Sequence, residues 1–169
     1  MWVTMKSDFI VAVHALVYLH HRKCLASSEE LAENICTNPA RVRKIMGKLK
    51  KLGLVTTREG HVGGYCPKTG LEKASLYEIA KGMDTVFVDT KWRSGNEETD
   101  CFISSGMSGV FDHLYGELND LCLERLKTVT LEDITRQIEA QQAASDVACH
   151  GARDGDCPAW KNVQAHQQS

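Results

Sequence analysis

A cluster of basic residues is the first feature of this sequence that could do chemistry. Positions 41 to 51 contain no Asp or Glu, and six of them are basic: Arg41, Arg43, Lys44, Lys48, Lys50 and Lys51. Ammonium and guanidinium groups neutralise phosphates, and those that reach a base edge pair with guanine. The cluster therefore indicates a nucleic-acid-binding face. An exposed helix face that only keeps the protein in solution is the alternative.

The charge of the whole chain supports the same interpretation. The net charge is −2, but residues 1–73 hold 12 Lys or Arg against 6 Asp or Glu, which gives +6. Residues 74–169 hold 8 against 16, which gives −8. A basic N-terminal part is expected of a nucleic-acid-binding domain, and an acidic remainder is not.

The elements around the basic cluster have a definite order. Apolar spacing predicts a helix over 7–21, capped by Ser7 or Asp8. Ser27 and Glu30 form a capping-box pattern for a second, short helix. Asn38 and Pro39 begin a third helix, which carries the basic residues and ends at Gly53. Residues 54–67 then predict a β-hairpin with a glycine-rich tip.

This order is that of a winged helix-turn-helix, whose third element enters the major groove of double-stranded DNA. Arg41, Arg43 and Lys44 are the expected base-edge and nearby phosphate contacts. Ser27, at a helix N-terminus, is a candidate phosphate anchor. The predicted DNA-binding residues are Ser27, Asn38, Ala40, Arg41, Arg43, Lys44, Lys48, Lys51 and, at the hairpin tip, His61.

A long amphipathic helix over 108–128 dominates the second half. Its apolar stripe is too extensive for one exposed helix and predicts a homodimer; the stripe comprises Phe111, Leu114, Leu118 and Leu121. The expected fold is mainly α with a small β-hairpin wing and a long dimerisation helix. The expected segments are a DNA-binding domain (5–83), a sensor loop (84–107), dimerisation helices (108–140) and a disordered tail (141–169).

Four motifs together support a family resemblance. They are Ser27-x-x-Glu30-Leu31-Ala32, Asn38-Pro39-x-x-Val42-Arg43-Lys44-Ile45-Met46, Gly63-Gly64-Tyr65 and Ser75-Leu76-x-x-Ile79. Over residues 5 to about 138 the chain resembles the bacterial winged-helix regulators that include IscR, NsrR and CymR (the Rrf-two family), and most closely the branch without a cluster. The resemblance implies a homodimer on a palindromic operator. IscR-like members usually carry Glu or Gln where this chain has Arg43 and Lys44, so its operator should differ.

The resemblance also suggests where a signal is sensed. Cluster-binding members carry three cysteines at a spacing that here falls on Cys101, Met107 and His113. With one thiolate left, no metal or cofactor is expected; a [2Fe–2S] cluster with Cys101 and His113 among its ligands is the alternative. We expect Cys101 to act as a redox- or electrophile-sensitive thiol, against the alternative of an inert surface cysteine.

The other cysteines fall into two groups. Cys24, Cys36, Cys66 and Cys122 occupy core-like or strand positions and are predicted to pack. Cys149, His150, Cys157 and His166 lie in the predicted tail, where a soft-metal site is the alternative to a solvated segment. Their spacing matches no standard zinc module.

The resulting prediction is a cytoplasmic, dimeric DNA-binding regulator, most simply a repressor. The sequence shows no export signal and no apolar run long enough to span a membrane. No motif of a known enzyme class occurs. The alternatives are a cluster-binding regulator of the same family and a winged-helix protein-interaction module that binds DNA weakly. The target genes, the operator and the inducer cannot be deduced from the sequence.

Overall fold

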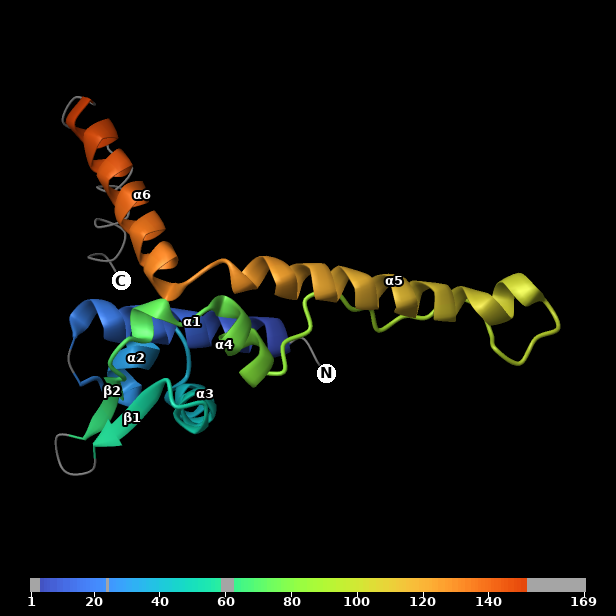
Figure 1. Cartoon of the computed structure of the whole chain (residues 1–169), viewed down its shortest axis with the longest axis horizontal. Helices are drawn as coiled ribbons and strands as arrows, with labels where there is room; N and C mark the ends of the chain where they lie inside the picture. The colour runs from blue at the N-terminus through green and yellow to red at the C-terminus, as the bar shows by residue number, and fades with distance from the viewer. Residues whose placement is uncertain (1–3, 24, 59–62, 152–169) are drawn as a thin grey trace, which may run out of the picture. The chain divides into compact units, whose positions relative to one another are not determined.

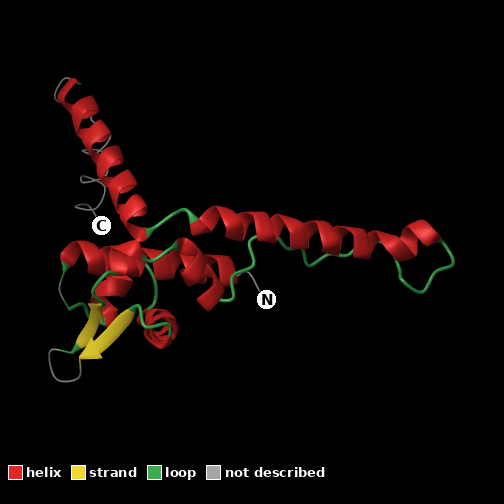
Figure 2. Cartoon of the chain, in the orientation of Figure 1, coloured by secondary structure: helices red, strands yellow, loops and turns green. Residues whose placement is uncertain are grey.

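The computed structural model describes residues 4–23, 25–58 and 63–151 (Figure 1). The described chain is mostly helical with one two-stranded antiparallel hairpin, which confirms the predicted fold class (Figure 2). Its helices and strands are α1 (Thr4–Arg22), α2 (Ser28–Ile35), α3 (Pro39–Lys51), β1 (Val55–Arg58), β2 (Gly64–Pro67), the short 3₁₀ helix η1 (Leu71–Lys73), α4 (Leu76–Gly82), α5 (Phe102–Lys127) and α6 (Leu131–Gly151).

The hydrophobic core forms around α1, which contacts α2, α3, α4 and β2. Leu16 and Leu19 of α1 are completely buried, as are Leu31 of α2 and Leu49 of α3. Each such side chain stabilises the fold by roughly 1.5–3 kcal/mol relative to exposure. α1 begins at Thr4 rather than at the predicted cap at 7–8, so that Ser7 and Asp8 lie inside the helix.

The hairpin is fastened to the segment before α2. Thr57 pairs with Tyr65 across the two strands, and Tyr65 in turn exchanges two backbone hydrogen bonds with Ala26, at 2.8 and 3.1 Å. The neighbouring Gly64 allows this approach, because a Cβ there would lie 2.5 Å from the Ala26 carbonyl oxygen. The Gly63-Gly64-Tyr65 motif therefore attaches the wing to the helical core.

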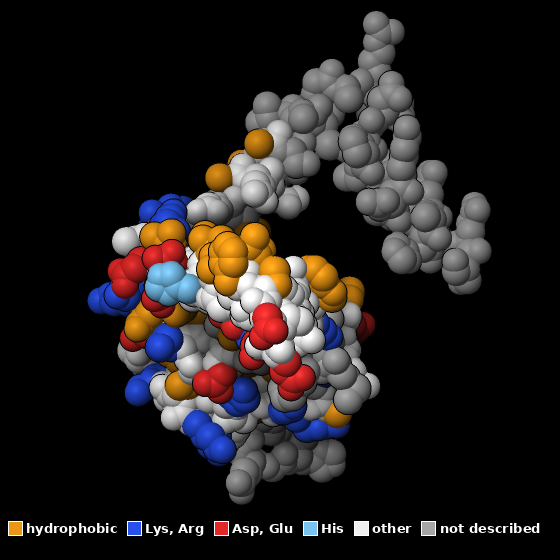
Figure 3. Space-filling model, turned by 90° about the vertical axis from the view of Figure 1, so that its right-hand side faces the viewer, with side chains coloured by type: hydrophobic (Ala, Val, Ile, Leu, Met, Phe, Trp, Pro, Cys, Tyr) orange, Lys and Arg blue, Asp and Glu red, His pale blue; other side chains and the backbone are white. Residues whose placement is uncertain are grey.

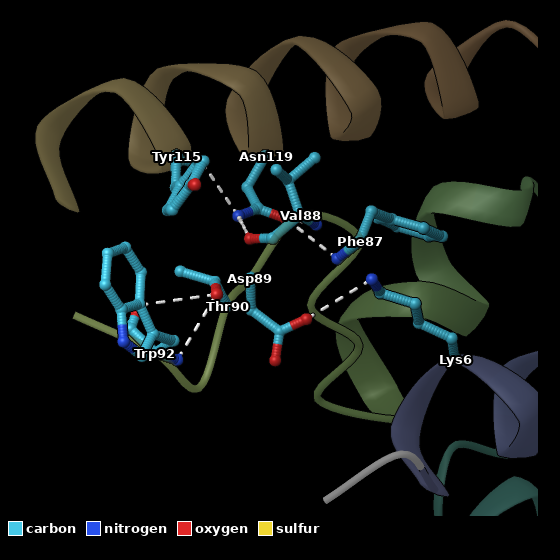
Figure 4. A network of polar contacts seen from close by, with 8 residues as sticks. All are labelled: Lys6, Phe87, Val88, Asp89, Thr90, Trp92, Tyr115 and Asn119. Carbon is cyan, nitrogen blue, oxygen red and sulfur yellow. Dashed lines mark hydrogen bonds and ion pairs between the residues drawn. The ribbon is translucent and has the colours of Figure 1, made fainter. Parts of the chain in front are cut away.

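The segment between α4 and α5 is held against α5 (Figure 4). The side-chain Oδ1 of Asn119 accepts hydrogen bonds from the backbone N–H groups of Phe87 (2.8 Å) and Val88 (3.0 Å), and its Nδ2 donates to the Val88 carbonyl (2.7 Å). Lys6 of α1 pairs with Asp89 of the same segment at 3.2 Å. These contacts connect this segment (residues 83–101, the linker) both to α1 and to α5.

Two predicted boundaries are wrong. α5 begins at Phe102, so the predicted loop of 84–107 ends at Cys101 and the long helix starts six residues before position 108. The six added residues are supported by the linker, because Ser104 Oγ accepts from the Asn96 N–H at 3.0 Å. α6 continues to Gly151, so residues 141–151 are helical rather than a disordered tail. Residues 152–169 lie outside the described part of the chain.

The chain divides into two compact units at Leu131. α1 to α5 belong to the first unit, and α6 from Glu132 onward makes up the described part of the second. Within α6, Arg136 pairs with Glu132 at 3.2 Å and with Asp133 at 3.7 Å. The assignment of residues 108–140 to dimerisation concerns a second copy of the chain and stays a prediction.

Candidate nucleic-acid interface

The basic helix α3 begins with a well-formed N-cap. The Asn38 side chain accepts a hydrogen bond from the Ala40 N–H at 2.7 Å, and Pro39 occupies the first helical position. The face toward the core carries Val42, Ile45, Met46 and Leu49, all of them buried. Packing of this apolar face fixes the rotation of α3 and leaves the opposite face in solvent.

The exposed face carries most of the predicted contacts. Ala40, Arg43, Lys44 and Lys51 are exposed, and Lys48 is half-buried, 3.9 Å from Asp84. Lys44 and Lys51 have no ion-pair partner among the described residues, so their charges are available to phosphates. Lys50, which was not among the predicted contacts, donates to the Thr57 hydroxyl of β1 at 2.8 Å. The structure therefore brings the basic face of α3 and strand β1 of the wing together.

Arg41 has a different environment from the other predicted contacts. Its Nε and Nη2 donate to Asp8 Oδ1 at 2.8 and 2.6 Å, and Nη2 also donates to the Ser7 hydroxyl at 2.7 Å. The guanidinium thus joins α3 to the start of α1. Arg41 and Arg43 were predicted to make the same kind of contact, but the two side chains lie in different surroundings.

Arg43 contacts the first turn of α2. Its Nη1 donates to Glu29 Oε1 at 2.9 Å and to Ser28 Oγ at 3.1 Å. The pKa of the Glu29 carboxyl is lowered, first by a backbone hydrogen bond and next by the Ser28 hydroxyl, with the Arg43 charge adding to the effect. Glu29 is therefore ionised beside a predicted base contact, an arrangement that no local sequence pattern indicates.

Tyr65 of β2 lies near the same pair. Burial is the main cause of its raised pKa; the Arg43 charge opposes the rise and the Glu29 charge adds to it. The contact of Arg43 with Glu29 and the backbone pairing of Tyr65 with Ala26, just before α2, bring α3, α2 and the wing to one surface. His61, the predicted contact at the wing tip, lies outside the described residues.

Ser27 is the N-cap of α2, as predicted. Its Oγ accepts from the Glu30 N–H at 3.1 Å. The second half of the predicted capping box does not form, because Glu30 Oε1 instead accepts from the Tyr18 hydroxyl at 2.9 Å and lies 3.4 Å from Arg22. The Ser27 side chain, which was predicted to anchor a phosphate, thus caps the N-terminus of α2.

The residues at the family's cluster positions do not converge within one chain. Cys101 is the N-cap of α5, while Met107 and His113 belong to the helix itself. Steps of six residues on an α-helix turn by about 240°, so three such positions point in three directions about 120° apart. Among the residues that the structure describes, no group of three or more His, Cys, Asp or Glu could hold a metal. These residues do not fit a cluster held by a single chain.

The predicted packing role of the cysteines is wrong for one of them. Cys36 is exposed, at the C-cap of α2 in the left-handed conformation (φ 57°). Cys66 and Cys122 are half-buried, and Cys101 is exposed. Cys24, the side chain of Cys149, Cys157 and His166 lie outside the described residues.

One face of α5 is hydrophobic and uncovered. Figure 3, seen from the N-terminal end of α5, shows hydrophobic side chains gathered along one flank. The four predicted dimerisation residues are between 37% and 66% exposed: Phe111, Leu114, Leu118 and Leu121. A contiguous apolar face of this kind is typical of a contact surface. Within the described residues, no helix is long and apolar enough to cross a membrane.

Comparisons with known proteins agree with this geometry. The family model Rrf2, described as an iron-dependent transcriptional regulator, matches residues 5–137. The Bacillus subtilis protein YwnA, provisionally assigned as an HTH-type transcriptional regulator, is 22% identical over 136 residues, covering 79% of this chain and 98% of its own length.

Two solved structures share the fold. A protein from Lactobacillus plantarum, described as a possible transcriptional regulator, has a TM-score of 0.67 at 22% identity, covering 83% of this chain and 97% of its own. The oxidised form of Staphylococcus aureus CymR has a TM-score of 0.54 at 17% identity, covering 76% of this chain and 92% of its own.

Proposed function

Because the chain belongs to the Rrf2 family of DNA-binding transcriptional regulators, which are not enzymes, we propose that it represses transcription as a homodimer on a palindromic operator. The observation that carries this proposal is the uncovered apolar face of α5 in a chain whose α3 presents a basic face. A second copy of the chain would cover the apolar face of α5. The dimer would then present two basic α3 faces. Two-fold symmetry of the protein then requires two related half-sites in the DNA.

The experiment selects an operator from a pool of random duplexes and measures its affinity at several salt concentrations. A regulator should bind the selected sequence far more tightly than a random duplex, and its affinity should fall steeply with salt. Loss of the gene should raise expression from the promoter that contains the operator. An interaction module would show weak binding without sequence preference.

We further propose that the exposed thiol of Cys101 controls operator binding. A peroxide would oxidise the thiol to a sulfenic acid and be reduced to water or an alcohol; a second thiol would then condense with it, releasing water and forming a disulfide. Cys101 lies at the junction of the linker and α5, and the linker contacts both α1 and α5. The oxidised form of Staphylococcus aureus CymR, a protein with the same fold, is the precedent on which this proposal draws.

A change at Cys101 would act through the linker and α5. The linker is fastened along α5 by ion pairs and hydrogen bonds, among them Arg93 with Asp112 and Ser108 with Glu97. Bulk or charge at Cys101 would disturb these contacts and, through them, the spacing of the two α3 helices. Operator half-sites demand a fixed spacing, so a modest shift weakens binding.

The alternative in this family is an iron-containing centre, which the family description favours. Since Cys101, Met107 and His113 diverge within one chain, such a centre would need ligands from elsewhere. The absorption spectrum of protein purified without oxygen separates the two proposals: a cluster gives a brown protein with charge-transfer bands, and a thiol switch gives a colourless one.

A further inference from the structure

The guanidinium of Arg43 is held at one of its three nitrogens. Nη1 makes both protein contacts, to Glu29 Oε1 and to Ser28 Oγ. The Ser28 hydroxyl donates in turn to Glu29 Oε2 at 3.0 Å. Ser28 is 9% exposed, so this end of the network is anchored in the packed part of α2.

The other edge of the same guanidinium is open. Within the part of the chain that the structure describes, neither Nε nor Nη2 of Arg43 has a hydrogen-bond partner, and the side chain is 53% exposed. Nε and Nη2 lie side by side in the guanidinium plane and can donate two parallel hydrogen bonds. The O6 and N7 atoms of guanine accept such a pair in the major groove.

From this arrangement we infer that Glu29 and Ser28 are positioning residues, which hold Arg43 with its Nε/Nη2 edge directed at a guanine of the operator. The inference rests on the proposed function, because it requires α3 to enter the major groove. It assigns sequence discrimination to a residue of α2 that carries the same charge as DNA.

The negative charge of Glu29 affects affinity and selectivity in opposite ways. A carboxylate near the DNA repels phosphates and so lowers affinity for every sequence. It also neutralises part of the Arg43 charge, which weakens a simple phosphate contact. Glu29 does, however, fix the orientation of the planar Nε/Nη2 donor pair of Arg43. This orientation matters more for a contact with a base edge than for a contact with a phosphate. Glu29 should therefore lower general affinity and raise the ratio of operator to random binding.

The test measures dissociation constants of wild-type protein and variants on the selected operator and on a random duplex of equal length. Glu29→Ala should lower the operator-to-random ratio about tenfold, since Arg43 loses its fixed orientation. Glu29→Gln, which keeps an oxygen acceptor, should retain most of that ratio. Once Arg43 is changed to Ala, adding Glu29→Ala should leave the ratio unchanged.

Glu33→Ala is the matched control. Glu33 is exposed on the same helix and has no ion-pair partner among the described residues, so its loss changes net charge alone. It should strengthen binding to both duplexes slightly and leave their ratio unaltered. Replacing the contacted guanine by 7-deazaguanine, which lacks N7, should weaken wild-type binding and have no effect on Arg43→Ala.

The outcomes separate this inference from the proposed function. If the wild type selects an operator but Glu29→Ala and Glu33→Ala change both affinities equally, Glu29 acts only through its charge and the inference is wrong. The same conclusion follows if the effect of Glu29→Ala persists without Arg43. If the wild type shows no preference among sequences, the proposed function is overturned, and this inference with it.

Discussion

Asp8 Oδ1 accepts two hydrogen bonds from the Arg41 guanidinium, from Nε at 2.8 Å and from Nη2 at 2.6 Å. The contact connects the beginning of α1 to the first turn of α3 and is mostly shielded, with side-chain exposures of 20% for Asp8 and 33% for Arg41. It gives Arg41 a role in holding the basic helix in place.

We therefore expect Arg41→Ala to destabilise the fold. The loss should be about 1–2 kcal/mol in the free energy of unfolding, since a charge-assisted pair is broken and Asp8 is left without its partner. Urea denaturation measures it, and Asp8→Ala combined with Arg41→Ala should cost less than the sum of the single changes. If Arg41→Ala is as stable as the wild type but selectively loses operator binding, Arg41 contacts a base, as the sequence predicted, and this structural role is wrong.

If the chain forms the proposed dimer, Leu118→Glu should convert it to a monomer and abolish tight operator binding. A carboxylate in the middle of the apolar face of α5 would have to be buried against the second copy, which is strongly unfavourable. Light scattering on a sizing column gives the mass. Gly116→Glu is the control, because a Cβ there would meet nothing within 4 Å and the 100° step per residue places position 116 opposite that face. A wild type that is monomeric at micromolar concentration would contradict the proposal.

Cys101→Ser should make operator binding resistant to a mild oxidant or a quinone-like electrophile, while the wild type is released from DNA. Fluorescence anisotropy with a labelled operator, before and after treatment and again after reduction, follows the change. Cys36→Ser is the control for a second thiol that is exposed among the described residues, and Cys149→Ser with Cys157→Ser covers the C-terminal cysteines. All the controls should respond like the wild type. Release of Cys101→Ser under the same treatment would exclude Cys101 as the sensor.

Gly64→Ala should loosen the wing. The new methyl group would lie 2.5 Å from the Ala26 carbonyl oxygen, so strand β2 must move away from Ala26 and lose the backbone hydrogen bonds of Tyr65. A loss of roughly 1–3 kcal/mol is expected. Gly47→Ala, at an exposed helical position with nothing within 4 Å, should instead stabilise by about 0.5–1 kcal/mol. Equal thermal midpoints for Gly64→Ala and the wild type would contradict this account of the motif.

Local signals in the sequence determined much of this protein. Asn38 before Pro39, the apolar spacing from Val42 to Leu49 and the glycines before Tyr65 predicted α3 and the wing correctly, because caps, periodicity and turn residues act over a few positions. The long helix was predicted too short. Ser104, Ser105, Gly106 and Gly109 are weak helix formers, and its first turns depend on linker contacts distant in sequence.

Only the tertiary structure distinguished Arg41 from Arg43. Residues that are two positions apart on a helix point about 200° apart around its axis. The Arg41 guanidinium therefore faces Asp8 of α1, and the Arg43 guanidinium faces Glu29 of α2. Both partners lie 14 or more residues away in the sequence, where no periodicity or capping rule can identify them. Sequence decided that α3 is basic; the packing of α1 and α2 against it decided which of its charges are left for DNA.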